Sequence, residues 1–286
     1  MRIGFIGAGK VGYSLGKLFS ESGIQVTGYY SLHEESSKEA AAFTNTKFFQ
    51  SYSELLNESD TLFLTVPDGQ ITPLFKELVS YCVSDKIICH CSGALSSQEA
   101  FPEISASGAF GYSLHPLFPV SNKYESYREL KDAFFCVEGH EKYMDDWKKI
   151  FSDMGIRTLM IKPSDKVKYH MACAVASNLV CAVIDEAVQL FTECGFDEQS
   201  ALSALSPLIK SNIEHILSDG CVNALTGPAE RADCQTVSKH LKCLSERNHP
   251  NDKNIYKSAS LRCADIAKRK HPEKDYSELE HIIQSS

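Results

Sequence analysis

Residues 2–12 set the strongest limit on the architecture open to this chain. A short apolar run, Ile3–Ile6, leads into glycines at positions 7, 9 and 12, and an apolar-periodic segment then ends at Gly23. With this G-x-G-x-x-G spacing, the first glycine allows a tight turn, the second lets a pyrophosphate approach the backbone, and the third lets helix and strand pack closely. Amide groups and the positive end of the helix dipole would face the phosphates. We therefore predict a dinucleotide site formed by Gly7, Ala8, Gly9, Lys10, Val11 and Gly12; a glycine-rich turn that binds nothing is the alternative.

The bulk composition is that of a globular protein without a nucleic-acid or membrane partner. A length of 286 residues favours two domains, and the net charge of -8 comes without a basic stripe. The sequence shows no apolar leader, and its most apolar run, Met171–Ile184, is shorter than a membrane span and contains Ser177 and Asn178. We expect neither nucleic acid nor a membrane as a partner.

The cysteines point to a reducing cytoplasm. Eleven cysteines is an odd count, and no pair spacing repeats, so neither a disulfide framework nor a zinc module is indicated. Cys89-His90-Cys91 has the residue types of a metal site. In a strand, however, the two cysteines face one way and His90 the other, so we interpret them as buried strand residues and predict no metal.

Strands alternate with helices as far as Lys162, which predicts a doubly wound, mostly parallel sheet of eight strands. From Pro163 onward the pattern is helical throughout, beginning with one helix over Asp165–Cys194 that is apolar on most of its circumference. We predict an α/β Rossmann domain over residues 1–162 and an all-helical substrate and dimerisation domain over residues 163–286. A helix that is apolar on most faces needs a partner subunit to cover it, so we expect a homodimer.

Loops at the carboxyl ends of parallel strands line the ligand crevice, and three such ends carry candidate residues. These are Val66-Pro67-Asp68, Ser92-Gly93, and His115, which Pro116 holds in a stiff extended loop. Asp68 is equally interpreted as the N-cap of the next helix, and Ser92-Gly93 as an ordinary strand-to-helix turn.

The end of the second strand bears on the choice of nucleotide. An NAD-binding protein usually places an acid there for the ribose hydroxyls, but this chain has Tyr30-Ser31. The missing acid, with Ser31, His33 and Lys38 nearby, favours NADP, while NAD stays possible. Ser31 with Glu34 also has the spacing of a capping box.

Several motifs occur together and in order: the glycine loop, Val66-Pro67-Asp68, His90-Cys91-Ser92-Gly93, Leu114-His115-Pro116, Tyr169-His170 with Ser177-Asn178, and Gly227-Pro228-x-x-Arg231-x-Asp233. With these motifs the whole chain resembles a family of Rossmann-like proteins usually named NADP-dependent oxidoreductases, whose C-terminal domain has no assigned function. That family is similar in architecture to pyrroline-5-carboxylate reductase, deazaflavin-dependent NADP oxidoreductase and the 6-phosphogluconate dehydrogenase superfamily. The resemblance implies the two-domain fold but no substrate.

The chain departs from the family at two places. Leu32 follows Ser31 where members tend to have arginine, which weakens the preference for NADP. Ala232 stands between Arg231 and Asp233 where members tend to have glycine, which takes positive φ more readily.

The candidate catalytic residues are His115, His170, Asn178 and Arg231. His115 or His170 would donate a proton, Asn178 would orient the substrate, and Arg231 would bind an anionic group on it. His170 and Asn178 fall on one stripe of the predicted long helix. In the related dehydrogenases a lysine and an asparagine one turn apart project from the corresponding helix, but no lysine lies one turn from Asn178.

Each of these residues also has a structural interpretation. His115 would bond a nearby carbonyl, Asn178 would be satisfied by backbone in a core, and Arg231 would pair with Glu230 or Asp233, while Asp233 would cap the helix after it.

Two functions follow from these residues. The first is an NADP(H)-dependent oxidoreductase that transfers a hydride to or from a small-molecule carbonyl or imine in the cleft between the domains. The second is a non-catalytic NAD(P)-binding protein that regulates or scaffolds a partner. The sequence does not identify the substrate or the direction of the reaction.

Overall fold

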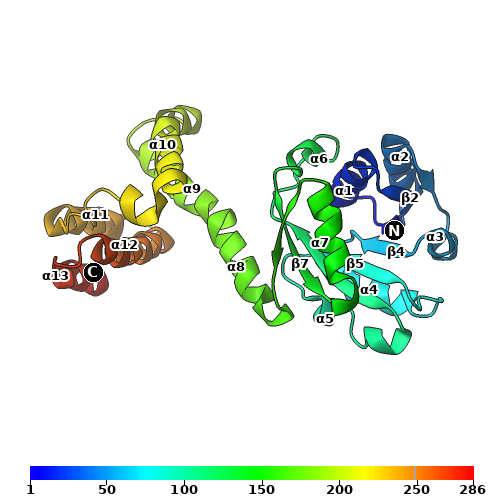
Figure 1. The fold of residues 1–286 in the computed structure, drawn as a ribbon. Coiled ribbons are helices and arrows are strands. Elements are labelled where there is room, and N and C mark those ends of the chain that lie inside the picture. The colour runs from blue at the N-terminus through cyan, green and yellow to red at the C-terminus, as the bar shows by residue number, and fades with distance from the viewer. Residues whose placement is uncertain (248) are drawn as a thin grey trace. The chain divides into compact units, whose positions relative to one another are not determined.

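The structure is a computed structural model that describes residues 1–247 and 249–286. The chain forms two compact units, Met1–Ala174 and Val175–Ser286, which are described separately (Figure 1). We expected the change of domain at Lys162, where the strands end; the contacts divide the chain later, so the first turns of the following helix belong with the sheet.

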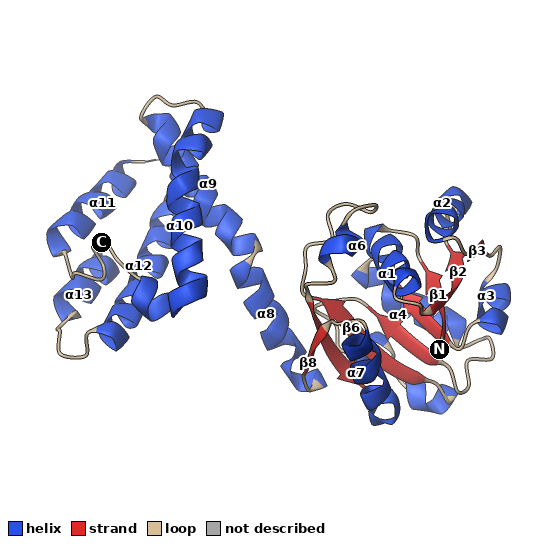
Figure 2. Ribbon diagram, turned by 45° about the horizontal axis from the view of Figure 1, so that its top comes forward, coloured by secondary structure: helices blue, strands red, loops and turns tan. Residues whose placement is uncertain are grey.

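The first unit is built on one eight-stranded sheet in the order β3-β2-β1-β4-β5-β6-β7-β8. Only the β6–β7 pair is antiparallel among the strand pairs of the described chain, which confirms the predicted mostly parallel sheet (Figure 2). The strands are β1 (Arg2–Ile6), β2 (Gln25–Tyr30), β3 (Lys47–Phe48), β4 (Thr61–Leu64), β5 (Ile87–His90), β6 (Phe110–Pro116), β7 (Phe134–Gly139) and β8 (Arg157–Met160).

Helices cover both faces of this sheet, because side chains alternate along each buried strand. Ile3 and Phe5 of β1 point into one apolar cluster with Trp147, whereas Ile6 packs into a second cluster on the opposite face. The first cluster lies under α1 (Lys10–Glu21), α2 (Glu34–Thr44), α6 (Ser126–Glu129) and α7 (Met144–Asp153). The second lies under α3 (Tyr52–Glu58), α4 (Asp68–Leu78) and α5 (Ser97–Ala100). Short 3-10 turns, Ile104–Ser107 and Glu141–Tyr143, complete the connections.

The second unit consists of helices, as predicted. Its elements are α9 (Asn178–Glu193), α10 (Glu198–Ala224), α11 (Cys234–Glu246), α12 (Pro250–Lys270) and α13 (Ser277–Ser285), and α10 changes direction at Gly220 (φ 77). Its largest apolar cluster joins α11, α12 and α13 around Leu241, Tyr276 and Leu279.

The predicted single helix over Asp165–Cys194 is wrong. Asp165 ends a 3-10 turn, Pro163–Asp165, and α8 (Lys166–Ala176) is separated from α9 by Ser177, whose φ of -128° and ψ of -76° are not helical. A periodicity of 3.6 continues across such a break, so the apolar pattern does not reveal it. Despite this break, the helical stretch Pro163–Glu193 is the one part of the described chain that is long and apolar enough to cross a membrane, by length and composition alone.

Candidate functional site

The turn between β1 and α1 borders a hollow of about 530 Å³ on the first unit. Gly7, Ala8 and Gly9 form one wall, and the ends of β2 and β4 form the others. Gly7 takes φ 102°, and a Cβ there would lie 2.6 Å from the carbonyl oxygen of Thr65, so the position requires glycine. The hollow therefore lies at the carboxyl edge of the parallel strands, where such sheets bind ligands.

The three glycines of this loop meet different neighbours. A Cβ on Gly12 would lie 2.6 Å from the Gly7 carbonyl oxygen, whereas a Cβ on Gly9 would meet nothing nearer than the Thr65 carbonyl oxygen at 3.9 Å. Gly9 is exposed and is the N-cap of α1, where no side chain of the described residues caps the helix. The first N–H groups of α1 are thus available to an anion, and the open space at Gly9 fits the approach of a pyrophosphate.

A second wall of the hollow follows β2. Tyr30, Ser31, Leu32 and His33 line it, and the Tyr30 ring packs on Tyr52 with centroids 4.4 Å apart. Leu32, which stands where the family tends to have arginine, is 84% exposed. An aromatic and apolar wall of this type suits the flat face of an adenine ring.

Two expectations about the start of α2 are corrected. The helix begins at Glu34 with His33 as its N-cap and without a capping side chain in the described chain, so Ser31 and Glu34 do not form a capping box. Lys38 forms ion pairs with Glu34 at 2.8 Å and Glu35 at 3.2 Å. Its positive charge is therefore paired with these two carboxylates instead of facing a 2'-phosphate. Of the polar residues considered for a 2'-phosphate, Ser31 and His33 lie in the wall of the hollow.

Val66, Pro67 and Asp68 lie between β4 and α4, and the first two line the hollow. Asp68 is not the N-cap of α4, because the helix starts at Asp68 itself and Pro67 precedes it. Instead the Ser92 hydroxyl donates a hydrogen bond to Asp68 Oδ2 at 2.7 Å and accepts the N–H groups of Ala94 and Leu95. These bonds tie the loop after β4 to the loop after β5.

Two predicted histidines meet at Gly93. A Cβ on Gly93 would lie 2.8 Å from His170 Cδ2 and 2.9 Å from His115 Nε2, so only glycine leaves room for both rings. His115 Nδ1 lies 2.7 Å from the hydroxyl of Tyr169, with the rings nearly perpendicular. Burial, the charge of Lys166 and then His170 lower the pKa of His115 to about 4. His115 is therefore neutral at pH 7, contrary to our expectation of a group that titrates near neutrality.

A buried lysine whose charge acts on His115 was not among the predicted residues. Lys166 is fully buried, and its Nζ donates to the Ser113 hydroxyl at 2.6 Å. Burial lowers the pKa of Lys166, while the thiol of Cys136 and the carboxyl of Glu138 act in the opposite direction. Glu138 is itself buried and accepts hydrogen bonds from the N–H and hydroxyl of Ser97.

A sequence signal for Lys166 was present. It lies four residues before His170, the one-turn spacing that we sought around Asn178. Because lysines are usually solvated, this spacing alone does not identify Lys166 as a buried group.

The other two candidate catalytic residues belong to the second unit. Asn178 is the exposed first residue of α9, and its Oδ1 accepts the Ser177 hydroxyl at 3.1 Å. Arg231 is exposed in the loop between α10 and α11, and Ala232 beside it takes the positive φ of 53° that the family's glycine would favour. Asp233 caps α11 by accepting the Thr236 N–H at 3.0 Å, as predicted. The structure thus brings His115 and His170 together, while the roles of Asn178 and Arg231 stay predictions.

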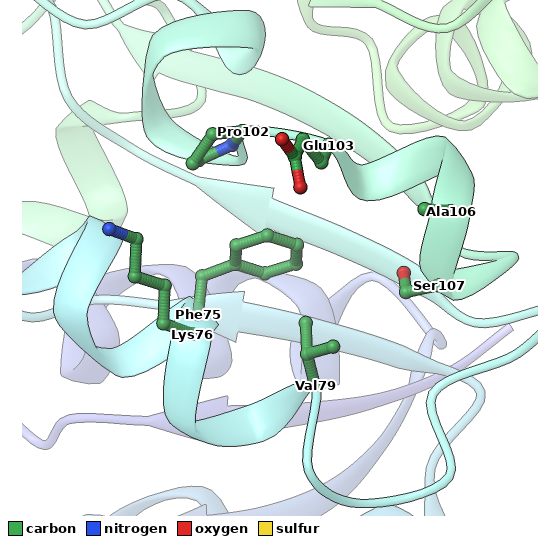
Figure 3. Close-up of a pocket in the computed structure, with 7 residues that line it drawn as sticks. All are labelled: Phe75, Lys76, Val79, Pro102, Glu103, Ala106 and Ser107. Carbon is green, nitrogen blue, oxygen red and sulfur yellow. The ribbon is translucent and has the colours of Figure 1, made fainter.

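A second hollow of about 400 Å³ lies between α4 and the segment after α5 (Figure 3). The ring of Phe75 faces it, with Lys76 and Glu103 at its sides. It contains none of the predicted site residues. Across the described residues, no group of three or more His, Cys, Asp and Glu side chains has the geometry to hold a metal ion.

Comparison with protein families divides the chain into two parts. Residues 1–116 match the model of a Rossmann-like domain, and residues 133–263 match that of a domain of unknown function, DUF2520. Comparison with curated proteins finds no match.

Solved structures share the whole fold. A protein of Thermotoga maritima is 24% identical with a TM-score of 0.74, covering 94% of this chain and 99% of its own. A Bacteroides fragilis protein, provisionally assigned as an NADP oxidoreductase, is 19% identical with a TM-score of 0.72, covering 92% and 98%. Pyrroline carboxylate reductase of Plasmodium falciparum, solved with NADP bound, is 15% identical with a TM-score of 0.58, covering 93% and 98%.

These similarities agree with the motifs that suggested the two-part architecture. The chain thus combines a region similar to the Rossmann-like domain, residues 1–116, with a following region similar to DUF2520, residues 133–263.

Proposed function

We propose that the protein is an NADP(H)-dependent oxidoreductase that transfers a hydride to or from a small-molecule carbonyl or imine. The observation that carries this proposal is the cluster of His115, Gly93 and His170 on the same sheet edge as the glycine-loop hollow. Neighbouring structures named as an NADP oxidoreductase and a pyrroline carboxylate reductase support the reaction class.

The residues of the hollow would hold the nucleotide in a defined direction. The α1 N-terminus and Gly9 would receive the pyrophosphate, and the wall with Tyr30 and Tyr52 would receive the adenine. The loop at Ser92-Gly93, fixed by Asp68, would then border the nicotinamide. The bound cofactor supplies the hydride donor or acceptor.

The histidine cluster would act on the oxygen or nitrogen of the substrate. A neutral imidazole N–H donates a hydrogen bond and polarises such an atom without being a strong acid. His115 is suited to that part because its pKa is lowered to about 4. His170 is exposed and would supply the second polar contact, with Asn178 and Arg231 as the proposed contacts for orientation and for an anionic group.

The test measures NADPH oxidation by the purified full-length chain with a panel of small cyclic imines and 2-oxo acids. The absorbance of the reduced nicotinamide is the readout. We expect turnover with at least one member, and His115→Asn should lower kcat by about a hundredfold while NADPH affinity is retained. Lys168→Met is the control, since Lys168 lies on α8 two residues before His170 and its side chain is 80% exposed. Equal turnover by His115→Asn and wild type would refute the assignment.

One observation favours the second function, a non-catalytic NAD(P)-binding protein. Burial lowers the pKa of His115 to about 4, so this imidazole carries no proton to donate as an acid at neutral pH. Tight nucleotide binding without turnover on any member of the panel would support this function.

Of the eleven cysteines, none forms a disulfide in the described structure, and we propose a reducing cytoplasmic location for either function.

A further inference from the structure

The His115–Tyr169 pair allows an inference about which nitrogen of His115 carries the proton. The Tyr169 hydroxyl lies 2.7 Å from Nδ1, and both side chains are half-buried. The pair joins two elements of the first unit, because His115 lies in β6 and Tyr169 in α8. At that distance one of the two groups must donate its hydrogen to the other.

The chemistry of the two groups sets the direction of this hydrogen bond. A phenol is a stronger acid than a neutral imidazole, and an unprotonated imidazole nitrogen is a better acceptor than a phenol oxygen. Burial, followed by Cys136 and Cys173, raises the pKa of Tyr169, so its O–H stays protonated. Both thiols also hydrogen-bond the Tyr169 hydroxyl, but sulfur is a weaker acceptor than an imidazole nitrogen. The favoured arrangement is O–H donating to Nδ1.

The other nitrogen of the ring then carries the hydrogen. Nε2 is the atom that a Cβ on Gly93 would meet at 2.9 Å, so it lies against the loop after β5. We propose that Tyr169 is a positioning residue that holds His115 as the neutral tautomer protonated on Nε2 and thereby turns that N–H toward the space beside Gly93.

This arrangement specifies how the proposed oxidoreductase would contact its substrate. An Nε2–H donor fits an acceptor atom, either a carbonyl oxygen or an imine nitrogen, placed beside Gly93. The opposite tautomer would present a lone pair there and would fit a hydroxyl or an ammonium group instead. The catalytic consequence rests on the proposed function, whereas the tautomer does not.

The chain contains a matched control for this geometry. In the second unit, His240 Nδ1 lies 2.7 Å from the Tyr256 hydroxyl, and the ring centroids are 5.6 Å apart against 5.7 Å for the first pair. The interplanar angles, 84° and 83°, are also alike. Tyr256→Phe therefore removes the same hydrogen bond at a residue outside the proposed site.

The experiment is a long-range proton–nitrogen correlation spectrum of the full chain labelled with nitrogen-15 histidine at pH 7. The signals of His115 and His240 are assigned from His115→Asn and His240→Asn. In wild type we expect His115 with an unprotonated Nδ1 and a protonated Nε2. In Tyr169→Phe the two His115 nitrogens should move toward the averaged shifts of mixed tautomers, while Tyr256→Phe changes His240 alone.

The kinetic arm uses the best substrate of the imine and 2-oxo acid panel. Tyr169→Phe should lower kcat roughly tenfold with little change in KM, which corresponds to the loss of one oriented hydrogen bond. Tyr256→Phe should have wild-type kinetics. A tautomer change in Tyr169→Phe with unchanged kcat would overturn the catalytic part of the proposal.

The spectrum decides the proposal even where activity is absent. A proton on Nδ1 of His115 in wild type overturns it, as does a single Nε2-protonated form that survives in Tyr169→Phe. If Tyr169→Phe does not fold, as judged by circular dichroism, the wild-type spectrum still decides the tautomer. Failure to bind any dinucleotide would refute the proposed function and leave the tautomer result standing.

Discussion

Substitutions in the glycine loop should separate stability from nucleotide binding, because the structure gives Gly9 and Gly12 different surroundings. An added Cβ at Gly12 would lie 2.6 Å from a backbone carbonyl oxygen and 2.7 Å from Thr65 Oγ1, which itself donates to that carbonyl at 2.7 Å. Neither neighbour can retreat without moving β1 or β4. At Gly9 the nearest atom is 3.9 Å away and φ is -86°, so an alanine fits without strain.

The expected magnitudes follow from these contacts. Gly12→Ala should cost about 1–3 kcal/mol, the usual range for forcing a methyl group into a filled space. For a domain of this size that lowers Tm by roughly 2–4 °C per kcal/mol. Gly9→Ala should change the stability of the nucleotide-free protein by less than about 0.5 kcal/mol. Gly9→Asp should raise the Kd for NADPH by at least about a hundredfold, since its side chain would occupy the space for the pyrophosphate.

Differential scanning calorimetry without nucleotide and calorimetric titration with NADPH measure the two effects. The expected pattern is a low Tm for Gly12→Ala, with a wild-type Tm and lost binding for Gly9→Asp. A Gly9→Asp protein that binds NADPH as wild type does would show that the nucleotide lies elsewhere. If Gly9→Asp lowered the Tm as much as Gly12→Ala does, the space at Gly9 would not be open.

Three further outcomes are expected. NADPH should bind more tightly than NADH, and Leu32→Arg should widen the difference by roughly tenfold, since an arginine recognises the 2'-phosphate; equal titration affinities for wild type would remove the preference. Light scattering should show a homodimer for wild type and a monomer for Val183→Asp, because the Val183 side chain is 51% exposed on an apolar helix. Binding of the wild-type chain to lipid vesicles would instead indicate that this apolar surface contacts a membrane. Stability to urea should fall as pH drops below 6.5, the ordinary pKa of histidine, because only the unfolded chain binds the protons of His115 and His90. For His115 the loss should reach up to about 3 kcal/mol and end near pH 4, and for His90 the loss should continue to about pH 3. A flat profile over that range would contradict it.

The glycine-loop part of the candidate site was predictable because it is encoded locally. One strand, one turn and one helix within residues 2–21 carry the glycine spacing, and buried parallel strands appear in the sequence as apolar runs between turn residues. The alternation of strands and helices then predicts parallel strands, since each crossover returns the chain in the same direction and leaves the carboxyl ends of the strands at one edge of the sheet.

The cluster around His115 was only partly predictable because it is assembled from distant segments. Gly93, His115 and Tyr169 follow or lie in β5, β6 and α8, and nothing in the spacing of the sequence specifies that Tyr169 reaches Nδ1. His115 was found from its place at a strand end, but the lowering of its pKa depends on burial and on Lys166. The break at Ser177 also escaped prediction, because an apolar helical pattern continues through it.

Lys166 provides the last prediction, since its charge lowers the pKa of His115 through space. Lys166→Met keeps most of the apolar stem and removes the ammonium group, so the pKa of His115 should rise toward its ordinary value in an NMR titration. Lys168→Met is the matched control: Lys168 is exposed, pairs with Asp165, and should leave the titration unchanged. An unchanged His115 titration in Lys166→Met, or an equal shift in both variants, would show that burial alone keeps His115 neutral. A rise confined to Lys166→Met would mean that the buried charge helps to keep His115 in its neutral, hydrogen-bond-donating form, which gives the site a reason to retain a lysine where an apolar residue would avoid the desolvation cost.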